Sequence, residues 1–156
     1  MIPVTRLNHA VLYVSDVDRS VAFYTEAFGL EVVSREMGGQ AAFLRSPRGD
    51  NHHDLGLFAA PGAPHPRTGT ITGLYHLAWQ VDRVDDLVTA RQTLRRMGAL
   101  TGQSDHGVSL SLYGADPDGN EFEIMWMLPR DEWGASAERA ATGPLDLPGA
   151  LARYGG

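Results

Sequence analysis

Cysteine is absent from the 156 residues of this chain. Disulfide bonds, thiolate nucleophiles and cysteine-based zinc sites are therefore excluded. Basic residues are also few, because 13 Lys and Arg stand against 19 Asp and Glu, which gives a net charge of −6 with neutral histidine. Nucleic acids and anionic membranes are bound by basic surfaces, so we expect neither as a partner.

Long apolar runs are absent as well. No window of the sequence reaches the ~20 apolar residues of a membrane-spanning helix. The first residues, MIPVTRLNHAVLYV, show no apolar segment behind a basic start, so we expect no signal peptide and a cytoplasmic protein. The hydrophobic fraction of 43% is high enough for a packed core.

A repeat with an offset of 67 residues organises the chain. Residues 7–18 read LNHAVLYVSDVD, and residues 74–85 read LYHLAWQVDRVD. Each copy begins with a strand pattern, continues with an amphipathic helix pattern and then gives three β-rich stretches separated by Gly, Pro and Asp. The order β-α-β-β-β, present twice, predicts an α+β fold of two βαβββ modules.

The same repeat sets the predicted boundaries. One domain, residues 1–128, contains the modules at about 5–60 and 71–128, and the Pro- and Gly-rich residues 61–70 link them. Residues 129–156 form a C-terminal extension in which DEWGASAERAA and DLPGALARYGG predict two short helices.

Helix ends are predicted from capping residues. Asp18 and Asp85 are the predicted N-caps of the two helices, because aspartate accepts hydrogen bonds from free backbone N–H groups. Gly29 and Gly98 are the predicted C-terminal ends, where glycine readily adopts a positive φ.

Two histidines occupy equivalent positions in the repeat. His9 and His76 are each predicted on the first strand of a module. If the modules are related by a pseudo-twofold axis, the two imidazoles can converge on one point. The alternative is two ordinary strand histidines with a common origin, but unpaired histidines facing a core are costly to bury.

The stretch ADPDGNEFEIMW contains a turn followed by a strand with a carboxylate in its middle. Alternate residues of a strand share a face, so Phe122, Ile124 and Trp126 form a packing face and Glu123 points the other way. A carboxylate between apolar neighbours needs a partner. Glu121, beside the turn, is expected to stay hydrated.

The spacing of these residues predicts a metal site. Glu123 lies 47 residues after His76, whereas the position 47 residues after His9 is Gly56, which has no side chain. Two histidines and one carboxylate with open positions are typical of non-haem Fe(II) enzymes, and Mn(II) and Zn(II) are the alternative metals.

Two further residues are candidates for acid–base chemistry. Tyr113 lies ten residues before Glu123, so a hairpin would bring its hydroxyl close to the carboxylate. His106 precedes the same strand. Near an open metal site these groups could move a substrate proton and hold a deprotonated oxygen. The alternatives are a loop histidine and a packing tyrosine.

The sequence resembles the vicinal oxygen chelate superfamily, which includes glyoxalase I, bleomycin- and fosfomycin-resistance proteins and type I extradiol dioxygenases. The resemblance covers about residues 5–128 and rests on LNHAVLYVSDVDRSVAFYTEAFGLE, GLYHLAW and LYGADPDGNEFEI. The longer DHGVSLSLYGADPDGNEFE is similar to the extradiol branch. The resemblance implies a curved mixed sheet around a central metal site.

What the extradiol branch implies can be placed residue by residue. His9, His76 and Glu123 would hold Fe(II), Tyr113 would be the catalytic tyrosine, and His106 the acid–base histidine. The implied reaction is ring cleavage of a catechol-type aromatic diol with O₂. Many members of the branch have a longer, duplicated chain, so the short form favours a homodimer.

Two alternatives remain open. A glyoxalase or epimerase needs a fourth ligand from the first module, where Gly56 has none to offer, although a shifted register would present His53 or Asp54. A metal-free antibiotic-binding protein of the same fold would use an apolar cleft at a dimer interface and would not need the His-His-Glu set.

Overall fold

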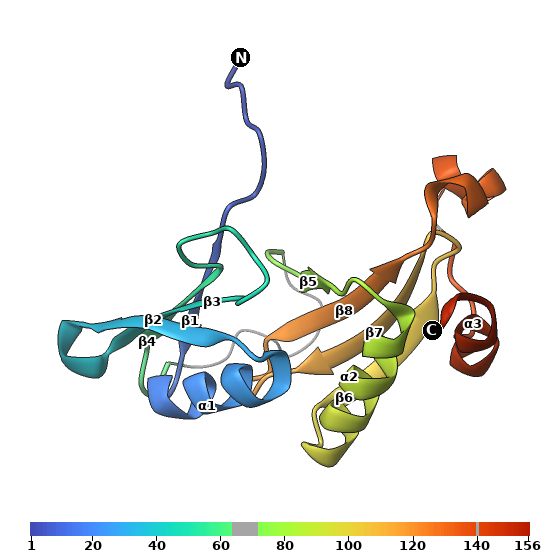
Figure 1. The fold of residues 1–156 in the computed structure, drawn as a ribbon. Coiled ribbons are helices and arrows are strands. Elements are labelled where there is room, and N and C mark those ends of the chain that lie inside the picture. Colours follow the sequence, from blue (N-terminus) through green and yellow to red (C-terminus); the bar gives the residue numbers. More distant parts are fainter. Residues whose placement is uncertain (64–71, 140) are drawn as a thin grey trace. The chain divides into compact units, whose positions relative to one another are not determined.

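The structure is a computed structural model that describes residues 1–63, 72–139 and 141–156 (Figure 1). Most of the predicted linker 61–70 lies outside the described residues. The chain divides into two compact units, Met1–Pro66 and Arg67–Gly156.

The first unit is a four-stranded sheet covered by one helix (Figure 1). Its elements are β1 Ala10–Val14, α1 Val17–Phe28, β2 Glu31–Glu36, the 3-10 turn Met37–Gly39, β3 Ala41–Arg45 and β4 Leu55–Ala59. The strand order is β1-β4-β3-β2, with β1 and β4 parallel and the other pairs antiparallel. Helix α1 packs on β2, β3 and β4.

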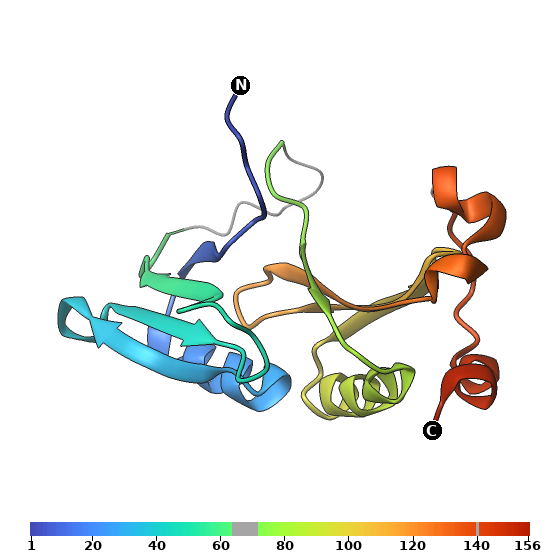
Figure 2. The same ribbon diagram turned by 45° about the horizontal axis from the view of Figure 1, so that its top comes forward.

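The second unit repeats this arrangement and adds the extension. Its elements are β5 Leu77–Gln80, α2 Val84–Arg96, β6 Leu100–Asp105, β7 Ser109–Ala115, β8 Glu121–Met127, two 3-10 turns at Arg130–Glu132 and Gly134–Glu138, and α3 Leu147–Tyr154. The strand order is β5-β8-β7-β6, with only β5 and β8 parallel. Helix α2 lies along one face of this sheet, and α3 packs on α2 (Figure 2).

The predicted fold class is confirmed. Both modules have the order β-α-β-β-β, and each forms a mixed sheet of its own. The predicted helix ends also hold, since Gly29 and Gly98 follow α1 and α2 with φ of 66° and 67°. The modules even share an irregularity, because the second strand of each has a β-bulge, at Val33 and at Thr101.

The predicted N-caps were wrong. Asp16, not Asp18, caps α1, and its side chain accepts a hydrogen bond from the Arg19 backbone N–H at 2.9 Å. Two aspartates two residues apart cannot be separated by sequence pattern. In α2 the N-cap is Arg83 without a side-chain cap, and Asp85 lies in the first turn, where its charge favours the positive end of the helix dipole.

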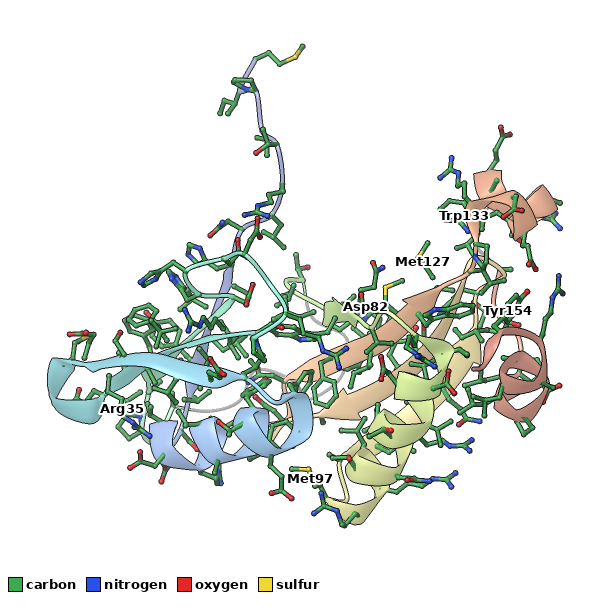
Figure 3. All side chains as sticks on the ribbon, in the orientation of Figure 1. Arg35, Asp82, Met97, Met127, Trp133 and Tyr154 are labelled. Atoms are coloured by element: carbon green, nitrogen blue, oxygen red, sulfur yellow. The ribbon has the colours of Figure 1, made fainter. Side chains whose placement is uncertain are left out.

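The extension differs from its prediction in one half. In place of the helix predicted for DEWGASAERAA, residues 130–138 form the two 3-10 turns, because Gly134 has a φ of 47° and interrupts the helical path. The second half is helical, as predicted, and Leu147 of α3 is fully buried. Figure 3 shows Trp133 at the 3-10 turns and Tyr154 on α3. The centroid of the Tyr154 ring lies 5.1 Å from that of the Trp126 ring.

Among the described residues, no helix is both long enough and apolar enough to span a bilayer.

Candidate functional site

The centre of the second sheet positions Glu123. Strand β8 lies between β5 and β7 (Figure 1), and Glu123 is paired with Ala78 on one side and with Tyr113 on the other. His76 was predicted on the first strand of this module, but it directly precedes β5. The predicted hairpin of β7 and β8 therefore exists, and its register places the tyrosine beside the carboxylate.

Four candidate residues meet on this sheet, and we refer to them as the second-unit cluster: His76, His106, Tyr113 and Glu123. The His76 Nε2 lies 3.1 Å from Glu123 Oε2, and the Tyr113 hydroxyl lies 3.4 Å from Glu123 Oε1. The hydroxyl also lies 2.7 Å from His106 Nε2. An unbroken series of polar contacts thus runs from one histidine to the other through the tyrosine and the carboxylate.

Glu123 is the buried member of the cluster, and the other three residues are partly exposed. Glu123 is only 8% exposed, as its place between two apolar residues predicted. Burial, followed by the negative charge of Glu123 and the hydrogen bond to it, raises the pKa of Tyr113 from 10.0 to about 12. The phenol therefore remains a hydrogen-bond donor at neutral pH.

Sequence reasoning missed the role of Glu121. It is half-buried, and its Oε1 lies 3.6 Å from His76 Nδ1. That nitrogen is buried and has no hydrogen-bond partner among the described residues. The sequence could have indicated this role, because Glu121 and Glu123 are two residues apart and therefore lie on the same face of β8.

The unsatisfied Nδ1 of His76 bears on whether a metal ion fits next to this histidine. A neutral imidazole carries one proton, and in the metal-free protein a proton on His76 Nε2 can be shared with Glu123. A metal bound at Nε2 would leave the proton on Nδ1, where it points toward Glu121 Oε1. Metal-bound histidines usually donate their second N–H to a carboxylate or a carbonyl. The surroundings of His76 therefore fit a metal ligand.

The turn before β8 fixes the start of the strand that carries Glu121 and Glu123. Asp116 is buried, and its Oδ1 accepts hydrogen bonds from the backbone N–H groups of Asp118 at 2.9 Å and Asn120 at 2.8 Å. Gly119 supplies a φ of 83°. DPDGN is thus a structural turn, as predicted, and it holds the start of β8 in register.

The first unit contains the counterpart of Glu123 at Gly56. Gly56 is paired with Val11 of β1 and Phe43 of β3, as Glu123 is paired with β5 and β7. A Cβ at Gly56 would lie 3.2 Å from Val11 Cγ2 and 3.5 Å from Phe43 Cε1. This position therefore has no ligand, and a side chain there would have to displace Val11 by a few tenths of an ångström.

His9 differs from its prediction in two respects. It precedes β1, so it lies next to the strand and not on it, and its side chain is exposed and does not face a core. Its Nδ1 lies 2.9 Å from the side-chain oxygen of Asn8. His53 lies beside it, with ring centroids 4.5 Å apart, and burial followed by the nearby positive charge of His9 lowers the pKa of His53.

Asp54, the other residue that a shifted register would offer, is already engaged. Its Oδ2 accepts a hydrogen bond from the Ser46 backbone N–H at 2.7 Å, and its Oδ1 accepts one from Asn51 Nδ2 at 2.7 Å. These bonds hold the loop before β4. Asp54 therefore acts as a loop-stabilising residue.

Within the part of the chain that the structure describes, no group of three or more His, Asp or Glu side chains is arranged to hold a metal ion. The second unit supplies one histidine and one carboxylate in contact, His76 and Glu123. His9 belongs to the first unit. The three-ligand set stays a prediction.

Comparison with known proteins gives the same superfamily as the sequence motifs. Residues 6–124 match the model of the Glyoxalase/Bleomycin resistance protein/Dioxygenase superfamily. A catechol-2,3-dioxygenase of Bacillus subtilis is 30% identical over 97% of this chain and 53% of its own length. Biphenyl-2,3-diol 1,2-dioxygenase 3 of Rhodococcus globerulus is 34% identical over 76% of this chain and 62% of its own length.

Solved structures of the same superfamily are similar to this chain. A glyoxylase/bleomycin resistance protein/dioxygenase domain from Frankia sp. EAN1pec is 26% identical, with a TM-score of 0.68 over 80% of this chain and 99% of that domain. The chain spans only about half to two thirds of the two dioxygenases above. The family match covers far more than half of this chain, and so the chain belongs to the Glyoxalase/Bleomycin resistance protein/Dioxygenase superfamily.

Proposed function

We propose that this chain is an Fe(II)-dependent extradiol dioxygenase that cleaves a catechol-type aromatic diol with O₂. The observation that carries the proposal is the second-unit cluster. In it a buried carboxylate contacts an imidazole on one side and a tyrosine–histidine pair on the other. Relatives named as diol dioxygenases support the same reaction class.

The metal would be held by His76 and Glu123 together with His9. This donor set leaves several positions open and suits Fe(II), with Mn(II) and Zn(II) as alternatives. The bound metal would supply a common binding point for the diol oxygens and O₂ and a route for electrons between them. The unsatisfied Nδ1 of His76 supports its place in the set.

Tyr113 would hold an oxygen of the diol. Its pKa of about 12 keeps the phenol protonated, so its O–H can donate a hydrogen bond to a deprotonated substrate oxygen. The same shift makes Tyr113 a poor base at neutral pH, because its phenolate is disfavoured both by burial and by the charge of Glu123. Tyr113 is therefore assigned to orientation and charge stabilisation.

His106 would move the proton. Its Nε2 faces the Tyr113 hydroxyl at 2.7 Å, so a substrate oxygen that replaces or joins this hydroxyl comes within reach of the imidazole. Histidine is suited to proton transfer near neutral pH. A homodimer is also part of the proposal.

The fourth-ligand position argues against an isomerase of the glyoxalase type. Gly56 is crowded by the side chains of Val11 and Phe43, and Asp54 is bound within its own loop. A ligand at position 56 or from Asp54 would therefore require rearrangement of β4 or of the loop before it.

Metal content after anaerobic loading with Fe(II) and desalting tests the proposal. We expect one iron per chain in the wild type, and its loss in Glu123→Gln, which keeps the shape of the side chain but removes its charge. Glu36→Gln, on the exposed end of β2, is the matched control and should keep the iron.

Oxygen uptake with simple catechols and biphenyl diols is the second readout. A wild type without metal above background would overturn the proposal in favour of a metal-free binder. A protein that holds iron but consumes no O₂ with any diol would instead favour a metal-dependent isomerase.

A further inference from the structure

The C-terminal extension, residues 129–156, contacts the second-unit cluster although the family match ends at residue 124. We infer that this extension is a positioning element: the backbone carbonyl of Ala141 fixes the tautomer of His106, so that Nε2 faces Tyr113 as a hydrogen-bond acceptor. The catalytic meaning of this tautomer depends on the function proposed above, whereas the tautomer itself does not.

The assignment follows from two contacts of one imidazole. His106 Nδ1 lies 2.9 Å from the Ala141 carbonyl oxygen, and His106 Nε2 lies 2.7 Å from the Tyr113 hydroxyl. A carbonyl oxygen can only accept, so the proton of the neutral ring must be on Nδ1. Nε2 then has a free lone pair that can accept the Tyr113 hydroxyl proton, in competition with Glu123 Oε1 at 3.4 Å.

The carbonyl is held in place by a bridge next to the histidine. Asp105 and Gly143 exchange two backbone hydrogen bonds of 3.0 and 2.8 Å, and the Ser104 hydroxyl donates to the Gly143 carbonyl at 3.3 Å. The bridge therefore ties the residue before His106 to a residue two positions after Ala141. This extends the hydrogen bonding of the end of β6 into the extension.

Both sides of the bridge are anchored further. After it, Leu147 of α3 is fully buried, and the Tyr154 ring contacts Trp126, which lies on β8 three residues after Glu123. Glu132, from the first 3-10 turn, accepts hydrogen bonds from the side chains of Tyr154 and Arg153. The two halves of the extension are thus joined, and the carbonyl is preorganised.

The extension selects the less common form of the ring. A free neutral histidine carries its proton mainly on Nε2. In that form His106 would present an N–H to Tyr113, and the hydroxyl would have to turn its own proton toward Glu123. With the proton on Nδ1, His106 is ready to take a proton at the atom that faces the site, as a general base requires.

Nitrogen NMR of the ¹⁵N-histidine-labelled, metal-free protein tests the inference, with His106→Gln to assign the signals. The spectra would be recorded about two pH units above the ordinary histidine pKa of about 6.5, where the ring is neutral. We expect a protonated Nδ1 and an unprotonated Nε2 in the wild type. A wild-type ring with its proton on Nε2 would overturn the inference.

Substitutions at Gly143 separate the bridge from simple packing. Gly143→Pro removes the N–H that bonds to Asp105, whereas Gly143→Ala keeps it, and its Cβ would meet nothing closer than the Asp105 carbonyl at 3.9 Å. We expect the Nδ1–H form in the alanine variant and a shift toward Nε2–H in the proline variant. Ser104→Ala, which removes one hydrogen bond to the Gly143 carbonyl, should give a smaller shift if the proline variant fails to fold.

Kinetics distinguish the two proposals. If the dioxygenase proposal holds, Gly143→Pro should lower kcat roughly 10- to 100-fold with unchanged iron content. A protein with the expected tautomer but without diol turnover would refute the dioxygenase function and leave the positioning role intact. A proline variant with a displaced extension and an unchanged tautomer would refute the positioning role.

Discussion

Replacing Tyr113 by phenylalanine removes one oxygen atom and with it two contacts of the second-unit cluster. The contact with His106 Nε2 is 2.7 Å long and the contact with Glu123 Oε1 is 3.4 Å long. A hydroxyl has a single proton, so the shorter contact identifies His106 as the acceptor. The phenylalanine variant would leave that nitrogen without its donor in a half-buried position.

The expected loss in the free energy of unfolding follows from the lengths of these two contacts. A neutral hydrogen bond contributes about 0.5–1.5 kcal/mol net, and an unsatisfied partner adds to the loss, so Tyr113→Phe should lower the free energy of unfolding by about 1–2 kcal/mol. For a chain of this size, that corresponds to a decrease in Tm of about 2–8 °C. The long contact with Glu123 should contribute little.

Double-mutant cycles in urea test the assignment in the metal-free protein. We expect Tyr113→Phe to couple to His106→Gln by about 1 kcal/mol and to Glu123→Gln by less than about 0.5 kcal/mol. A larger coupling to Glu123 would refute the reasoning, because it would place the hydroxyl proton on the carboxylate side.

Four further predictions concern the same two sheets. The absorbance of Tyr113 should titrate near pH 12, and Glu123→Gln should lower this pKa while leaving it above 10.0, because burial remains after the negative charge is removed. Since the folded-state pKa is raised, the associated stability is complete below pH 10 and is lost as pH rises toward 12, so Tyr113→Phe should flatten the pH dependence of urea unfolding in that range. Gly114→Ala should lower stability by about 1–3 kcal/mol, since its Cβ would lie 2.4 Å from a buried phenylalanine ring and 2.9 Å from a backbone carbonyl, and a normal Tm would contradict this. Gly56→Glu should lower Tm and leave the iron content unchanged, and a gain in bound metal would disprove the crowding at that position.

Much of the fold was predictable because its signals are local. Alternating strands, the helical patterns of α1 and α2 and the glycines after these two helices depend on neighbouring residues, and these were confirmed. The repeat also predicted a long-range feature, since the spacing of 47 residues matched Gly56 with Glu123, and both are paired at equivalent places in their sheets. Spacing succeeds here because both modules keep the same number of residues between their first and last strands.

The missed features depend on packing between distant segments. The contact of His106 with the Ala141 carbonyl requires the extension to return to the end of β6, and no residue pattern specifies that path. Glu121 was expected to be hydrated, because a sequence does not show that His76 covers the start of β8. His53 precedes β4, and the 4.5 Å distance between its ring centroid and that of His9 joins two segments 44 residues apart.

The parallel pair at the edge of each sheet has a consequence for how the chain folds. Val11 pairs with Gly56 and Ala78 with Glu123, each across 45 residues, whereas the other strands of each sheet are joined as local hairpins. Because closing a long loop is slower than closing a hairpin, we expect the three-stranded meander of each module to form before its first strand docks. His76 immediately precedes such a strand, so its contact with Glu123 would be made only at the last step, and an intermediate without docked β5 would be compact yet unable to assemble the cluster.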